Sequence, residues 1–301
     1  MKTHSDILPT NTFSLTSFAT DFLQLTKFRL AISVVFSSVA GYLLAVDQIE
    51  FSILIGLFFG GFAMVGASNA FNQWIEKDKD ALMDRTKNRP LPAGRMNNLT
   101  AIIIASLLTF VGIYVLNSIN FKTAIFGILS IFIYTCIYTP LKSVTPLSVF
   151  VGAFPGAIPF MLGWVAATGR FGIEPGVLFM VQFFWQFPHF WAIGWMMDED
   201  YKKAGFKMLP TGNPDQVTAF QIVFYTFWTV VISVLPFTQY TGVLNLSFQA
   251  VLFLVLIGVY FLFNALKLMK NRTKETAKKL MYASIVYITL LQIIYVVDKW
   301  I

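Results

Sequence analysis

Long apolar runs separated by short polar segments dominate the chain. They lie approximately at residues 28–46, 51–75, 101–116, 121–139, 147–168, 175–197, 217–236, 247–266 and 280–297. A helix that crosses a bilayer core takes roughly 20 apolar residues, and several runs reach that length. They do not alternate in the ~10-residue segments typical of a transmembrane β-barrel. Backbone groups in lipid must satisfy their own hydrogen bonds, so the pattern predicts an all-α integral membrane protein with nine transmembrane helices.

Composition supports a membrane protein over a soluble one. The chain is 56% hydrophobic and 12% charged, whereas a soluble domain carries roughly a quarter charged residues. So few charges do not cover the surface of a large water-soluble α-domain. We therefore expect the lipid bilayer to be a partner of most of the chain.

The basic residues predict the orientation of the bundle. With nine alternating spans, all of the 22 Lys and Arg residues except Lys122, Arg170 and Lys299 fall on one side. Basic residues concentrate in cytoplasmic loops, so the N-terminus is expected to be cytoplasmic and the C-terminus outside. This topogenic role accounts for the net charge of +7, and we expect no nucleic-acid partner.

The chain divides into two unequal parts. Residues 1–26 are polar and lack the pattern of a cleaved signal or of a transit peptide, so we interpret them as a cytoplasmic N-terminal segment. Residues 27–301 form a single predicted transmembrane domain. A bacterial plasma membrane, with the functional site toward the cytoplasm, is the expected location.

Oxygen-bearing side chains recur every four residues where the second run ends: Asn72, Glu76, Asp80 and Asp84. On one helix such residues face the same way, with about 6 Å between successive positions. Carboxylate and amide oxygens suit Mg²⁺, which keeps other positions for water and substrate phosphates. Arg85 and further cations follow, and guanidinium groups bind phosphate oxygens. The alternative is an ordinary solvated helix end with topogenic basic residues.

A second mixed cluster follows the sixth run. It contains Asp198, Glu199 and Asp200 together with Lys202, Lys203 and Lys207. Because it lies on the same predicted side as the first cluster, the two could bracket a diphosphate through two metal ions. Taken alone, it is equally well read as a charged cytoplasmic loop.

These motifs resemble the UbiA superfamily of intramembrane prenyltransferases. Asn72, Glu76 and Asp80 match its NxxxDxxxD pattern with Glu in place of the first Asp, and the RTKNRP segment at residues 85–90 matches its RTxxRP pattern. The second pattern of the superfamily, DxxxD, is incomplete here, because Asp200 is followed four residues later by Ala204. Within the superfamily the chain is most similar to the heme O synthase branch. The segments that carry this similarity are LTKFRL, YTPLKSVTPLS, GAFPGAIPFMLGW, WQFPHFWAIGW and DYKKAGFKMLP.

The resemblance implies helices around a central cavity and Mg²⁺-dependent transfer of a farnesyl group. The donor is then farnesyl diphosphate, the acceptor is a vinyl group of heme B, and the product, heme O, is handed to a downstream heme-modifying enzyme. The predicted catalytic and metal-binding residues are Asn72, Glu76, Asp80 and Asp200, with Asp198 as a further ligand. The predicted diphosphate-binding residues are Arg85, Lys142, Lys203, Arg89, Lys27 and Arg29.

His189 is a candidate heme-binding residue, through the iron or a propionate. It lies in the apolar sixth run, where a buried histidine needs a partner. A structural histidine bonded to a neighbouring helix is the alternative. Gln182 and Gln186 precede it and are expected to line the cavity.

Three other functions match only part of this pattern. An aromatic prenyltransferase of quinone biosynthesis would share the stripe of predicted metal ligands at Asn72, Glu76 and Asp80. A transporter would carry its polar clusters near the bilayer midplane at broken helices, whereas both clusters here fall at one predicted face. A non-catalytic assembly factor gives no reason for carboxylates at four-residue spacing before RTKNRP.

Overall fold

The structure is a computed structural model that describes residues 15–301. Every long element in this part of the chain is helical. The helices are α1 Leu15–Leu25, α2 Phe28–Ala45, α3 Phe51–Ile75, α4 Lys77–Asp80, α5 Asn98–Ile119, α6 Phe121–Phe132, the π-helix η1 Ile133–Tyr138, α7 Thr139–Leu141, α8 Ser148–Thr168, α9 Ile173–Met196, α10 Asp198–Lys203, α11 Gln216–Ser233, the 3-10 helix η2 Leu235–Phe237, α12 Phe248–Asn271 and α13 Lys274–Trp300. The all-α prediction is therefore confirmed. Residues 1–14 of the predicted N-terminal segment lie outside the described residues.

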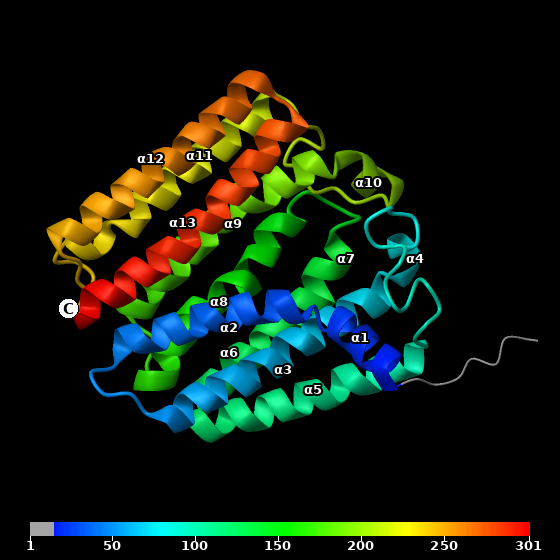
Figure 1. Cartoon of the computed structure of the whole chain (residues 1–301), viewed down its shortest axis with the longest axis horizontal. Coiled ribbons are helices and arrows are strands. Elements are labelled where there is room, and N and C mark those ends of the chain that lie inside the picture. The colour runs from blue at the N-terminus through cyan, green and yellow to red at the C-terminus, as the bar shows by residue number, and fades with distance from the viewer. Residues whose placement is uncertain (1–14) are drawn as a thin grey trace, which may run out of the picture.

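The long helices form a ring. Going round it, α2 packs on α3, α3 on α6, α6 on α8, α8 on α9, α9 on α13 and α13 on α2. In addition, α2 packs directly on α8. The outer helix α5 covers α3, and α11 and α12 cover α9 and α13. Figure 1 shows the short helices α4 and α10 together at one end of this ring. The loops that carry both charged clusters therefore meet at one end of the bundle.

Eight helices in the described residues are long and apolar enough to cross a membrane: α2, α3, α5, the continuous stretch α6–α7, α8, the stretch α11–η2, α12 and α13. The remaining predicted span, the sixth run at residues 175–197, corresponds to α9, which has 24 residues but is not among these eight. Its sequence includes Gln182, Gln186 and His189. With these helices the chain is a multi-pass membrane protein. The count of nine spans stays a prediction.

Capping side chains fix the starts of several helices. Asn97, Asn120, Asp215, Ser247 and Thr273 each accept a hydrogen bond from a backbone N–H three residues later. Such caps satisfy donors that the first turn of a helix leaves unpaired. Asn120 also donates to the carbonyls of Val165 and Ala166, both at 3.1 Å. It thereby joins the start of α6 to the end of α8.

Two glycines allow α2 and α8 to approach closely. A Cβ atom placed on Gly163 would lie 1.8 Å from the Ser38 carbonyl oxygen, and one on Gly41 would lie 1.9 Å from that of Phe160. Small residues at helix contacts let backbones pack tightly inside a membrane. This contact joins α2 and α8 directly.

The helix α1 is an addition to the predicted fold, since it lies in the segment expected to precede the domain. Asp21 is buried and pairs with Arg95 at 2.9 Å. Gln73 of α3 donates to the carbonyls of Gln24 and Leu25 at the end of α1. These bonds fix α1 against α3 and against the loop that contains RTKNRP.

Candidate functional site

A cavity of about 740 Å³ lies inside the ring. It is lined by residues of α2, α3, α4, α6, η1, α8, α9, α10 and α13 and of the loops at one end of the bundle. Of the predicted site residues, those that line it are Asn72, Glu76, Asp80, Arg85, Arg89, Lys27, Lys142 and His189. Gln182 and Gln186 line it as well. Its volume falls in the range of ligand pockets, roughly 300–1,000 Å³.

Three of the four residues predicted to form one stripe at four-residue spacing line this cavity. Asn72, Glu76 and Asp80 are each at least 96% buried. The helix α3 ends at Ile75, yet the Glu76 N–H donates to the Asn72 carbonyl and the Asp80 N–H to the Glu76 carbonyl. These bonds continue the four-residue hydrogen-bond pattern of a helix across the break between α3 and α4, so the three residues remain on the same face. The prediction is wrong for Asp84, which lies beyond the end of α4 with a side chain 63% exposed.

Each of the three buried oxygen-bearing side chains forms an ion pair or a hydrogen bond with another side chain. Glu76 forms an ion pair with Lys142, and Asp80 forms one with Arg89 at 2.6 Å. Asn72 donates to the Thr139 hydroxyl at 3.1 Å. Buried charges are stable only when they are paired or hydrogen-bonded. The site is therefore compact and charge-compensated.

The π-helix η1 shapes the wall that faces the stripe. The Thr139 N–H donates to the carbonyl of Tyr134 five residues earlier, which is the π-helical pattern. Tyr134 and Tyr138 both line the cavity, with ring centroids 5.2 Å apart. The Lys142 ammonium lies 5.0 Å from the ring centroids of Tyr138 and Phe206. Sequence reasoning missed these tyrosines, because hydrophobic patterning carries no signal for a π-helix.

Lys27 joins the same end of the cavity from the turn between α1 and α2. Its backbone is left-handed, with φ of 48°. Burial, followed by the nearby positive charges of Arg89 and Lys142, lowers the pKa of Lys27 to about 7. A bound anion would offset this repulsion and favour the protonated lysine. Arg29, the other candidate of that segment, is exposed and does not line the cavity.

The second charged cluster lies at the rim. Asp200 accepts from the Arg85 N–H at 3.4 Å and from Lys203 at 3.0 Å. The Lys203 hydrogen bond lowers the pKa of Asp200. Lys203 also pairs with Asp84 at 2.7 Å, so it joins the two clusters. None of Asp198, Asp200 and Lys203 lines the cavity, and Asp198 pairs with Lys202 at 2.8 Å.

The oxygen donors at this end fit a divalent cation whose coordination shell a bound substrate would complete. Within residues 15–301, no group of three or more His, Cys, Asp and Glu side chains is placed to hold a metal ion. Mg²⁺, however, is usually bound through one or two carboxylates together with waters and substrate phosphates. Glu76, Asp80 and the Asn72 amide supply that set of donors. The metal-binding roles of Asn72, Glu76, Asp80, Asp198 and Asp200 stay predictions.

A polar cluster lies deeper in the cavity. Gln292 of α13 donates to Ser37 of α2 at 3.0 Å and to Gln182 of α9 at 3.3 Å. Gln186 donates to the carbonyls of Ala153 and Gln182. Ser37 and Gln292 were missed by the sequence analysis. A lone amide in an apolar span is costly in lipid, and this is the signal by which Gln292 could have been found.

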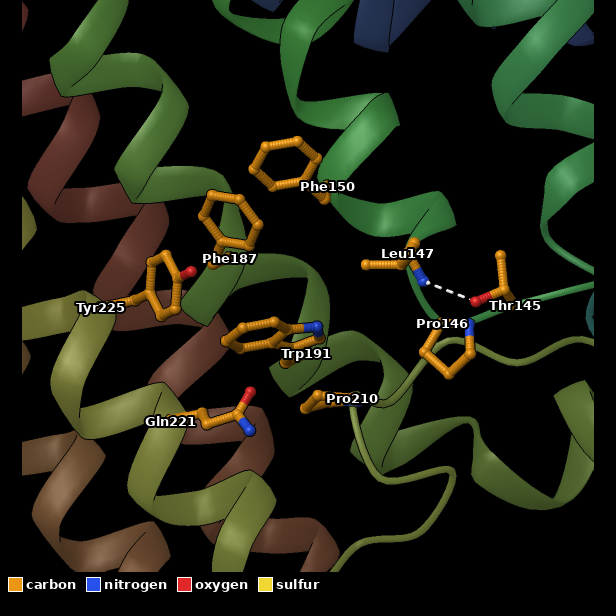
Figure 2. A pocket seen from close by; sticks show the side chains of 9 residues that line it. All are labelled: Thr145, Pro146, Leu147, Phe150, Phe187, Trp191, Pro210, Gln221 and Tyr225. Atoms are coloured by element: carbon orange, nitrogen blue, oxygen red, sulfur yellow. Dashed lines mark hydrogen bonds between the residues drawn. The ribbon is translucent and has the colours of Figure 1, made fainter.

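A smaller cavity of about 290 Å³ lies between α8, α9 and α11 (Figure 2). Figure 2 shows Phe187, Trp191 and Tyr225 along it, with the Phe187 and Tyr225 ring centroids 4.3 Å apart. None of the predicted site residues lines it. The large cavity, which gathers the charged side chains, is therefore the candidate active site.

Comparison with known sequences identifies related proteins over nearly the whole chain. The profile described as "UbiA prenyltransferase family" matches residues 34–290. A protein from Christiangramia forsetii named protoheme IX farnesyltransferase is 62% identical over 285 residues, which cover 95% of each chain. One of the same name from Flavobacterium johnsoniae is 59% identical, covering 96% of this chain and 98% of that protein.

Solved structures of much lower sequence identity share the fold. A digeranylgeranylglyceryl phosphate synthase superposes with a TM-score of 0.78 at 18% identity, covering 94% of this chain and 99% of that one. A UbiA homologue from Archaeoglobus fulgidus, bound to DMAPP and Mg²⁺, gives a TM-score of 0.64 at 15% identity. That match covers 91% of this chain and 99% of the homologue.

Proposed function

The chain belongs to the UbiA prenyltransferase family and is a membrane-embedded prenyltransferase, and from this premise we propose that it farnesylates heme B. The donor is farnesyl diphosphate, the acceptor is a porphyrin vinyl group, and the product is heme O. The names of the 62% and 59% identical relatives support this choice of substrates. Hand-over of the product to a heme-modifying enzyme remains part of the proposal.

The observation that carries the proposal is the division of one cavity into two chemically different ends. Acidic and basic side chains line one end, among them Glu76, Asp80, Arg89 and Lys142. Aromatic and amide side chains, with His189, line the rest. A prenyl diphosphate has the same division, with a charged head and an apolar tail. The cavity thus suits a donor whose reactive carbon lies where its two ends meet.

At the charged end, the residues bind and orient the diphosphate. Arg85, Arg89 and Lys142 present positive groups to its oxygens, with Lys27 beside them and Lys203 at the rim. Asn72, Glu76 and Asp80, with Asp200 at the rim, would hold Mg²⁺, which supplies charge neutralisation to the leaving diphosphate. The A. fulgidus homologue bound to DMAPP and Mg²⁺ supports a prenyl diphosphate and Mg²⁺ as the ligands.

Beyond the charged end, the cavity protects an allylic cation from water. Tyr134, Tyr138 and Trp185 present rings to the cavity, and the face of an aromatic ring attracts a cation. The farnesyl carbon then bonds to the terminal vinyl carbon. Water adds to the adjacent carbon and loses a proton, which completes a hydroxyethylfarnesyl group.

We also propose that α9 is the ninth span. At 24 residues it is about 36 Å long, sufficient to cross a bilayer. It packs against α8, α11 and α13, so its polar residues face the cavity and protein, not lipid. Nine spans and the basic loops favour a cytoplasmic N-terminus and an active site toward the cytoplasm of a bacterial plasma membrane.

The test is incubation of the purified protein with heme B, farnesyl diphosphate and Mg²⁺, followed by mass analysis of the porphyrin. The expected product carries one added farnesyl group and one added hydroxyl group. A parallel reaction replaces heme B with 4-hydroxybenzoate. Prenylation of the benzoate with heme B unchanged would overturn the proposal in favour of quinone biosynthesis.

A further inference from the structure

The hydrogen bonds of His189 define its tautomer. His189 Nδ1 lies 2.8 Å from the Ser284 hydroxyl oxygen on α13. The same hydroxyl donates to the Met281 carbonyl at 2.6 Å. A serine hydroxyl has one proton, and a carbonyl oxygen can only accept. The proton between Ser284 and His189 must therefore come from Nδ1–H, which leaves a lone pair on Nε2.

Nε2 is the ring nitrogen that remains available. It has no hydrogen-bond partner in the described part of the chain, and it is not among the fully enclosed polar atoms that lack one. Since His189 lines the large cavity, Nε2 is open to that space. The cavity thus contains a bare imidazole nitrogen in its middle section.

Two contacts hold the imidazole plane in place. The Trp185 ring stacks on that of His189, with centroids 4.7 Å apart and planes 18° apart. The Trp185 indole donates to the Ser284 carbonyl at 2.7 Å. Ser284 is fully buried, so it anchors both the imidazole and the ring stacked on it. Metal-binding histidines commonly have this arrangement, with the second ring nitrogen donating to a fixed acceptor.

We infer that Ser284 is a positioning residue that presents Nε2 of His189 as an axial ligand to the iron of the porphyrin acceptor. The inference rests on the proposed function. A lone pair on Nε2 can accept but cannot donate, so a propionate, which also only accepts, is not its partner. An iron bond fixes the centre of the porphyrin and leaves its vinyl-bearing edge free to face the prenyl group.

Heme B titrated into the purified full-length protein tests this, with absorption and electron paramagnetic resonance spectra reporting an imidazole ligand. His189→Gly is expected to lose that signature and to regain it when imidazole is added. Ser284→Ala removes the acceptor of Nδ1–H and is expected to weaken heme binding about 10- to 100-fold. Ser284→Thr keeps a hydroxyl and is expected to restore binding. Ser118→Ala is the matched control, because Ser118 makes a similar bond within α5 at an exposed position.

The outcomes separate this inference from the proposed function when farnesyl transfer is measured in parallel. A wild-type spectrum in His189→Gly, together with normal heme O formation by the wild type, overturns iron ligation and leaves the function intact. Heme binding by Ser284→Ala equal to wild type overturns the positioning role. A spectrum that depends on His189, in a protein that forms no heme O, instead overturns the proposed function.

Discussion

Charge compensation at the charged end of the cavity bears directly on how a diphosphate would bind there. Glu76 and Asp80 are each paired with a cation, Lys142 and Arg89 respectively. In the proposed function, a diphosphate with its metal brings both signs of charge, so the carboxylates would exchange cationic side chains for metal while those side chains would turn to phosphate. Binding then replaces existing ion pairs and leaves no buried charge alone, which limits its electrostatic cost.

The substitution Asp80→Asn tests this exchange at a single residue. It preserves shape and an oxygen that Arg89 can bond, but removes the negative charge. We expect turnover to fall by at least about 100-fold, comparable to loss of one strong electrostatic contact in an active site. Asp78→Asn is the control, since Asp78 lies on the same short helix and is exposed. Equal turnover in both variants would remove Asp80 from the site.

The lowered pKa of Lys27 predicts that substrate binding depends on pH. With a pKa of about 7, its ammonium is present below pH 7 and is lost as the pH rises through that value. Because kcat/KM reports the free enzyme, we expect kcat/KM for the prenyl diphosphate to decrease above pH 7. Lys27→Arg remains charged and should flatten this decrease. The same decrease in the arginine variant would assign it to another group.

At the scale of elements, the π-helix is the feature that aligns the two walls of the site. It continues α6 and leads to Thr139 and Lys142, which contact Asn72 and Glu76. The sequence analysis found the stripe and Lys142 separately, because each has a signal in residue type. It did not find Tyr134 and Tyr138, and it extended the stripe to Asp84. Hydrophobicity does not encode where α4 ends or where a hydrogen-bond register changes.

Deleting Cys136 tests the importance of this register. The deletion removes one residue from η1, so the wide π-helical turn that carries Tyr134 and Tyr138 narrows toward an α-helical one. The Tyr134 and Tyr138 rings then shift relative to the cavity that they line, and we expect prenyl transfer to decrease while membrane insertion is retained. Cys136→Ala keeps the residue count at an exposed position and should remain active. Full activity after the deletion would show that the π-helix is dispensable.

The close contact of α2 and α8 predicts a stability effect that is independent of chemistry. Gly163→Ala places a methyl group against the Ser38 carbonyl, and overpacking of this kind costs typically about 1–3 kcal/mol. We therefore expect a lower thermal unfolding temperature in detergent. Gly176→Ala on α9 is the control, because nothing lies within 4 Å of its added Cβ atom. An unchanged unfolding temperature for Gly163→Ala would mean that the helices separate at little cost.

For the whole molecule, hydrophobic runs alone predicted most helix positions within a few residues. The run at 51–75 coincides with α3, and that at 147–168 nearly coincides with α8. The closed ring and its cavity were expected only from family resemblance, since run lengths do not specify which helices pack together. The contacts of Ser284 and Ser37 had no sequence signal, because serines are common in the spans and only their neighbours distinguish them.

In the proposed function, the charged end of the large cavity holds the diphosphate of a prenyl donor. Its most direct test is a structure of the protein with Mg²⁺ and a farnesyl diphosphate analogue whose bridging oxygen is replaced by sulfur. We predict the diphosphate between the Asn72, Glu76 and Asp80 stripe and the Lys142 side chain, with the farnesyl chain running toward His189. A diphosphate bound elsewhere, with the Glu76–Lys142 and Asp80–Arg89 pairs intact, would contradict the account.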